Sequence, residues 1–81
     1  AQAESLYRES LEIREKNGEK LAVSQNLYNL GLLMLEQQKY QQAETHLLKA
    51  VEIREQFLGR DNKLFKRALQ KLIDTYNVQD K

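Results

Sequence analysis

Residues that could carry chemistry are few in this sequence, and they are dispersed. His46 is the only histidine, and the chain contains no cysteine. A metal site or a catalytic triad would need further ligands or an Asp–His–nucleophile set, and neither pattern accompanies His46. The carboxylate pairs Glu12/Glu15 and Glu52/Glu55 fall on helix faces that we expect to be exposed, where they are ordinary solvated charges. We therefore predict that the protein is not an enzyme and binds no metal and no cofactor.

A local excess of basic residues lies in the last quarter of the chain, against only Asp61 and Asp74. One interpretation is a polar helix face that keeps the end of the domain in contact with water. The other is a surface for an acidic partner or for nucleic-acid phosphates. No basic stripe occurs elsewhere and no exposed aromatic residues are expected for base stacking, so nucleic acid is the partner we weigh least. The basic residues are Arg60, Lys63, Lys66, Arg67 and Lys71.

Length and composition predict one small, soluble, cytoplasmic domain. The chain has 81 residues, 31% of them charged, and a net charge of +1. No apolar run approaches the roughly 20 residues of a membrane span, so we expect no membrane partner. The first residues, Ala-Gln-Ala-Glu-Ser, lack the basic and apolar regions of a signal peptide. Proline is absent and only three glycines occur, which favours an all-helical fold.

Apolar residues at intervals of three and four predict four helices, at residues 1–17, 20–37, 40–58 and 62–78. Gly18 and Gly59 suit the left-handed residue that follows a helix end. Asp61 or Asn62 is the expected N-cap of the fourth helix. Because all three connections are short, consecutive helices are expected to pack antiparallel.

The stretch 27–50 is the centre of this pattern and predicts a helical hairpin. Its two apolar stripes are Leu27, Leu30 and Met34, then Ala43, Leu47 and Ala50. Gly31 lies on the first stripe, although glycine costs roughly 1 kcal/mol relative to alanine within a helix. We therefore expect the partner helix to approach closely at Gly31, most simply at Ala43.

The chain repeats itself. A shift of 40 residues aligns Ala3-Glu4-Ser5 with Ala43-Glu44-Thr45, and the segment 11–15 with 51–55. After the linkers the shift becomes 42, which aligns Leu27, Leu30 and Met34 with Leu69, Leu72 and Tyr76. The first and third helices are therefore copies of one another, and so are the second and fourth.

These residues resemble the tetratricopeptide repeat, which reads Trp-x-x-Leu-Gly-x-x-Tyr, then Ala-x-x-x-Phe, a second Ala and a Pro. Departures from this pattern are Leu27 for Trp, Met34 for Tyr, Leu47 for Phe and Glu55 for Pro. The long period, together with Leu27–Gly31 and Leu58–Asp61, is similar to the repeats of kinesin light chains and related spindle-orientation adaptors. Seven residues match the motif in position: Leu27, Leu30, Gly31, Met34, Ala43, Leu47 and Ala50.

The resemblance implies an α-solenoid fragment. Residues 1–17 would be the second-type helix of a truncated repeat, residues 20–58 a complete hairpin, and residues 61–78 a capping helix. Ile73 occupies the position equivalent to Gly31 and would obstruct a following helix, as expected of a terminal element. The first helix would lack its first-type partner helix, which would leave Leu6, Tyr7 and Leu11 partly exposed. This exposed edge predicts self-association.

The function that the resemblance implies is a protein-interaction scaffold that binds a peptide or a partner helix in a concave groove. Asn29 matches the family asparagine that contacts the main chain of the ligand, while Lys71 stands at the equivalent position in the last helix. Arg67 and Lys71 favour an acidic ligand, and Glu36 and Asp74 favour one of mixed charge. The alternative is a structural or oligomerisation module without a peptide ligand. By motif position, the groove residues would be Gln25, Tyr28, Asn29, Leu32, Glu36, Arg67, Gln70, Lys71 and Asp74.

Overall fold

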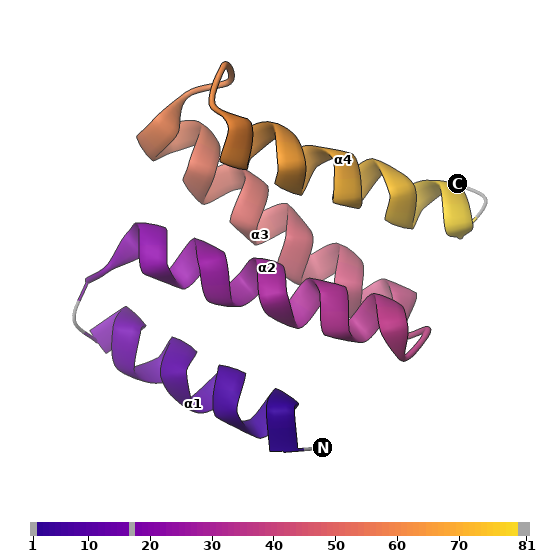
Figure 1. Cartoon of the computed structure of the whole chain (residues 1–81), viewed down its shortest axis with the longest axis horizontal. Helices are drawn as coiled ribbons and strands as arrows, with labels where there is room; N and C mark the ends of the chain where they lie inside the picture. The colour runs from indigo at the N-terminus through magenta and orange to yellow at the C-terminus, as the bar shows by residue number, and fades with distance from the viewer. Residues whose placement is uncertain (1, 17, 80–81) are drawn as a thin grey trace.

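The chain is built from four helices, as its apolar pattern predicts. The computed structural model describes residues 2–16 and 18–79, and these contain helices and connecting turns without a strand (Figure 1). The helices are α1 (Gln2–Lys16), α2 (Lys20–Glu36), α3 (Tyr40–Leu58) and α4 (Lys63–Val78). Residues 1 and 17 of the first predicted helix lie outside the described residues. The all-α prediction is confirmed.

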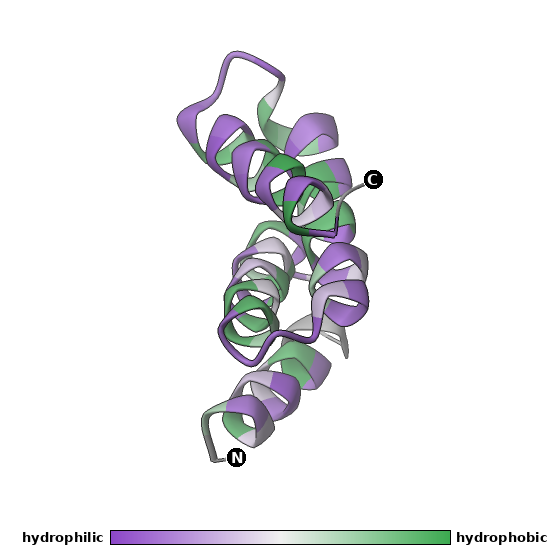
Figure 2. Cartoon of the chain, turned by 90° about the vertical axis from the view of Figure 1, so that its right-hand side faces the viewer, coloured by the Kyte–Doolittle hydropathy of each residue, from purple (hydrophilic) through white to green (hydrophobic). Residues whose placement is uncertain are grey.

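The helices are stacked side by side in chain order, each antiparallel to the one before it (Figure 1). α2 packs against α1 and α3, α3 also packs against α4, and α2 touches α4 lightly. The molecule is a slab with extents of 37 × 34 × 15 Å, and Figure 2 shows its narrow side. Because two reversals separate them, α2 and α4 run in the same direction (Figure 1).

The core lies between α2, α3 and α4. Both predicted stripes of the central hairpin are buried, and α4 contributes Phe65, Ala68 and Leu72. Leu69 and Tyr76 of the predicted α4 stripe are half-buried, whereas Ile73 is 42% exposed. Removing this apolar area from water is the main favourable term in folding. The central residues of the core are Val23, Leu27, Tyr28, Leu47, Ala50, Val51, Phe65, Ala68 and Leu72.

Gly31 of α2 faces the side chain of a leucine on α3. A Cβ atom added at Gly31 would lie 2.6 Å from Cγ and 2.7 Å from Cδ2 of Leu47. The prediction was that the backbone of the partner helix passes close to Gly31, at Ala43. The nearest atoms are instead those of the Leu47 side chain, so the predicted partner was wrong. Leucine reaches further from its backbone than alanine does, so it fills the space that the missing side chain leaves.

The helix ends use different devices. Gly18 and Gly59 have positive φ angles of 72° and 86°, as predicted. Asn62 is the N-cap of α4, since its side-chain oxygen accepts a hydrogen bond from the backbone N–H of Leu64 at 2.8 Å. Gln38, between α2 and α3, has φ 61°, a left-handed conformation that the sequence did not reveal.

α1 has a neighbouring helix on one side only within the described part of the chain. Leu6 is 63% exposed and Ile13 is 58% exposed, while Tyr7 and Leu11 are half-buried. Their equivalents in α3 include Leu47 and Val51, which are buried. The same repeated sequence therefore packs on both sides in α3 and on one side in α1.

Candidate ligand-binding groove

Most of the predicted groove residues of α2 follow one open face of that helix. Gln25 and Glu36 are exposed, and Asn29 and Leu32 are half-buried. At 100° per residue these four positions fall within about 60° of one another around the helix axis. They form a continuous row about 16 Å long at 1.5 Å per residue.

Tyr28 is placed differently from its predicted neighbours. Its side chain is only 8% exposed and belongs to the core. The guanidinium carbon of Arg54 lies 4.9 Å from the centroid of its ring. Tyr28 therefore packs in the core beneath the accessible row on α2 and does not offer a free surface to a ligand.

Arg54 of α3 is the polar centre of this region, and it is only 1% exposed. Its Nε donates to Ser24 Oγ at 3.2 Å, and its Nη2 donates to Gln25 Oε1 at 3.2 Å. Its Nη1 donates to the backbone carbonyl of Leu64 at 3.0 Å. One buried side chain thus ties α3 to the row on α2 and to the first turn of α4.

The charge of Arg54 has unusual surroundings. Burial lowers the pKa of Arg54; Tyr28 acts in the opposite direction, and the positive charge of Arg67 adds to the lowering. An arginine nevertheless remains cationic at neutral pH. Within the described part of the chain Arg54 forms no ion pair, so its partners are neutral oxygens and an aromatic face. Arg54 is therefore a buried positive charge that lies outside the ion pairs of the described residues.

The remaining predicted groove residues lie on α4. Arg67 and Gln70 are exposed, and Lys71 and Asp74 are half-buried. The amide of Gln70 donates to a carboxylate oxygen of Asp74 at 2.9 Å. The predicted residues of the two helices carry charges of both signs, Arg67 and Lys71 against Glu36 and Asp74.

α1 also contributes to this side of the molecule. A hollow of about 320 Å³ between α1 and α2 is lined by Ala3 and Tyr7 together with Asn29, Leu32, Leu33 and Glu36. Sequence patterns placed Tyr7 at the exposed edge of the first helix and Ala3 in the repeat, and they assigned neither to a binding surface. The structure brings them beside three of the predicted groove residues.

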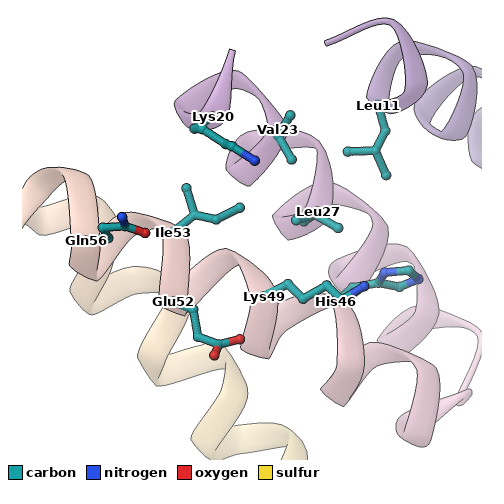
Figure 3. Close-up of a pocket in the computed structure, with 9 residues that line it drawn as sticks. All are labelled: Leu11, Lys20, Val23, Leu27, His46, Lys49, Glu52, Ile53 and Gln56. Atoms are coloured by element: carbon teal, nitrogen blue, oxygen red, sulfur yellow. The ribbon is translucent and has the colours of Figure 1, made fainter. Parts of the chain in front are cut away.

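A second hollow opens on the opposite side of α2. It measures about 410 Å³, lies between α1, α2 and α3, and has an apolar floor that includes Val23, Leu27 and Ile53 (Figure 3). Lys20, Lys49, Glu52, Gln56 and His46 surround this floor, along with Leu11 of α1. Leu27 and Asn29 are two residues apart, about 200° around the helix, so this hollow is separate from the groove.

His46 lies at the edge of this second hollow, together with Lys49. Burial lowers the pKa of His46, and the charges of Arg8 and Lys49 lower it further. The described residues contain no group of three or more His, Cys, Asp or Glu side chains that could hold a metal ion. Over the same residues, no helix is long and apolar enough to cross a membrane.

Comparison with known proteins agrees with this geometry. The profile of the tetratricopeptide repeat family matches residues 1–56, which is more than half of the chain. The chain therefore belongs to the tetratricopeptide repeat family. Repeats of this family generally mediate protein–protein interactions and are typically scaffolds without enzymatic activity. Searches of curated proteins and of solved structures found no match.

The residue that sequence reasoning missed is Arg54. Arginine is usually a surface residue, so the type alone gave no reason to place it in the core. Its spacing carried a signal, because Arg54 continues the buried series Ala43, Leu47 and Ala50 at an interval of four. The repeated phrase also places Arg14 at the equivalent position of the first helix.

Proposed function

We propose that the protein is an interaction scaffold that binds an extended or helical segment of a partner. The segment would lie along the inner faces of α2 and α4, which are the faces that carry Gln25 and Asn29 and, on α4, Arg67 and Lys71. The observation that carries this proposal is the row of accessible polar side chains on α2, which is supported from below by Arg54 and Tyr28. Rigid support of this kind favours binding, because side chains that are already ordered lose less entropy when a ligand arrives.

The charges on these faces favour a ligand of mixed sequence. Arg67 and Lys71 offer charge-assisted donors on α4. Glu36 on α2 and Asp74 on α4 would repel acidic residues. A segment that carries residues of both charges fits this arrangement, and its binding should weaken as salt rises.

The architecture supports finer proposals about the class. The repeat period of 40 to 42 residues supports assignment to the long-period subclass typical of kinesin light chains. We take α1 as a second-type helix, α2 and α3 as the complete hairpin, and α4 as a capping helix whose exposed Ile73 prevents close packing of a further helix.

A double substitution tests the groove. Asn29→Ala with Lys71→Glu changes one half-buried position on each of the two helices, so the fold should persist. Bound proteins recovered with the wild type are quantified against those recovered with the variant. The matched control is Lys49→Glu with Gln56→Ala, which alters the rim of the second hollow. If bound proteins are lost only with Asn29→Ala and Lys71→Glu, the result supports binding along α2 and α4. Equal recovery of bound proteins by the wild type and both variants contradicts it.

Self-association is the second candidate function. The exposed side chains of Leu6 and Ile13 on α1 favour it, since adjoining apolar surface of this kind is commonly covered by another chain. In that case the repeats would serve mainly as an oligomerisation module. The two functions use different faces, so variants can separate them.

A further inference from the structure

The second hollow, between α1, α2 and α3, is an open site that the proposed groove does not use. Its floor is apolar, and Val23 and Leu27 of α2 are almost fully buried there. Leu11 of α1 and Ile53 of α3 are half-buried and add to this floor from two different helices (Figure 3). The hollow measures about 410 Å³, so it can receive apolar side chains from another helix.

The rim of this hollow has an excess of positive charge. Lys20 and Lys49 are exposed and take no part in the ion pairs of the described residues. Glu52 is the one carboxylate among the described residues that line the hollow, and His46 is neutral at neutral pH because burial lowers its pKa. A segment that docks here should therefore combine apolar side chains with carboxylates.

The chain itself carries this combination on the outer face of α1, which consists of Leu6, Glu9, Glu12 and Ile13. Leu6 is 63% exposed and Ile13 is 58% exposed, and both glutamates are exposed beside them. At 100° per residue, the four positions lie within about 120° of one another around the helix axis. Leu6, Glu9 and Ile13 also have the spacing i, i+3 and i+7 by which an amphipathic helix anchors itself in a groove.

We propose that the second hollow of one copy of this chain binds the outer face of α1 of another copy. Leu6 and Ile13 lie on the apolar floor, and the carboxylates of the outer face lie beside Lys20 and Lys49. This inference rests on self-association, the second candidate function, and it adds the surface that receives α1.

The positions of the two surfaces make this contact head-to-tail. Leu11 lines the hollow, and Ile13 of the outer face is two residues further along, about 200° around the helix. The outer face and the hollow therefore lie on opposite sides of α1. One copy can dock into a second while it receives a third, so the assembly continues until it closes a ring or forms a chain.

Direct pairing of two outer faces is less favourable than docking into the hollow. It would bury the same apolar side chains, but it would bring Glu9 and Glu12 of one copy close to those of the other. Like charges that meet across an interface oppose association. Docking into the hollow replaces this repulsion with attraction to Lys20 and Lys49.

Charge reversal tests which surfaces meet. The outer-face variant is Glu9→Lys with Glu12→Lys, and the hollow variant is Lys20→Glu with Lys49→Glu. All four positions are exposed, so the fold should persist, and circular dichroism checks the helical content of each variant. In sedimentation measurements we expect each variant to associate about tenfold more weakly than the wild type, because like charges then face one another.

The combined variant, with all four substitutions in one chain, distinguishes a specific contact from an effect of net charge. Its net charge equals that of the wild type, and its reversed outer face meets a reversed hollow. We therefore expect it to associate as strongly as the wild type. The matched control is Lys63→Glu with Lys66→Glu, which repeats the charge change of the hollow variant on α4 and should leave association unchanged.

Three results would overturn the proposal. A hollow variant that associates like the wild type would show that α1 meets another surface, such as a second α1, and self-association itself would stand. A combined variant that is as weak as the hollow variant would show that the two surfaces do not face each other. A wild type that remains a monomer at millimolar concentration would remove both the docking and the second candidate function.

Discussion

Gly31 is the single position where the absence of a side chain lets two helices meet. The Cγ and Cδ2 atoms of Leu47 occupy the place where a Cβ atom would lie, and Leu47 is fully buried. The cost of glycine in a helix is thereby offset by a tighter contact in the core. The same logic explains why Leu47, rather than a smaller residue, faces it.

We predict that Gly31→Ala destabilises the protein by about 1 to 3 kcal/mol, the usual range for an overpacked core. Alanine alone would favour the helix by roughly 1 kcal/mol, so the sign of the change identifies the contact. Urea denaturation measures the free energy of unfolding. In a Leu47→Ala background the same substitution should become neutral or stabilising. A gain in stability in both backgrounds would disprove the close contact.

His46 gives a pH dependence of defined sign. Burial lowers its pKa in the folded state, so protonation favours unfolding. The stability contributed by neutral His46 is complete above the unfolded-state pKa of about 6.5 and is lost as pH falls toward the folded-state value. His46 is the only histidine, so no other side chain has an ordinary pKa in this window.

Thermal unfolding between pH 7.5 and 5 checks this prediction. The wild type should lose stability across the range, and His46→Gln should lose less because glutamine does not titrate. Parallel profiles for the two proteins would mean that the folded and unfolded states bind the proton at His46 equally well.

The turn between α2 and α3 shows how one helix is ended without glycine. Lys39 N–H donates to the carbonyl of Met34 at 2.8 Å, and Gln38 N–H donates to that of Leu35 at 3.0 Å. This is the Schellman arrangement, in which the residue after the cap is left-handed and is usually glycine. Gln38 takes that role with φ 61°, so the turn retains a local strain.

We predict that Gln38→Gly stabilises the protein by about 0.5 to 1 kcal/mol, because relief of the left-handed strain exceeds the entropy cost of glycine. The control is Gln37→Gly, where φ is −85° and glycine offers no relief. That control should be destabilising by about 0.5 kcal/mol. Chemical denaturation that ranks the two variants the other way would contradict the strain.

The sequence predicted the four helices because their apolar spacing and two of their three connections carry strong local signals. Helix boundaries are indicated by residue types that favour helix ends, here Gly18, Gly59 and Asn62. Gln38 does not, since only the hydrogen bonds formed after folding reveal its conformation. Arg54 was missed for a related reason: its residue type favours the surface, and only three partners brought together from α2 and α4 allow it to be buried.

The predicted groove rows on α2 and α4 could be placed from helical periodicity, because residues three and four apart share a face. The burial of Tyr28 could not, since it depends on Arg54 of another helix. The contribution of Ala3 and Tyr7 likewise depends on how α1 packs beside α2. Local patterns therefore located the faces, and contacts between helices decided which side chains remain accessible.

At the scale of the whole molecule, α1 packs against another helix on one side only and exposes apolar side chains on the other, within the described residues. Leu6→Gln with Ile13→Gln should reduce self-association, because both side chains are more than half exposed. Sedimentation measurements at high protein concentration should show a larger oligomeric fraction for the wild type than for this variant. Phe57→Gln on α3 is the matched control, since Phe57 is 51% exposed on another helix. Self-association that depends on Phe57, or that is unchanged by either variant, would exclude α1 as the interface.

The central claim is that a partner segment lies along the inner faces of α2 and α4. The most direct measurement is an NMR titration of the protein with a capped pentapeptide that has a central glutamate. The titration follows backbone and side-chain amide signals. The account predicts that the largest shifts fall at Gln25, Asn29, Arg67 and Lys71, and that the side-chain amide of Asn29 moves with the backbone. Shifts concentrated instead around Val23, Lys49 and Ile53 of the second hollow, with Asn29 unmoved, would contradict it.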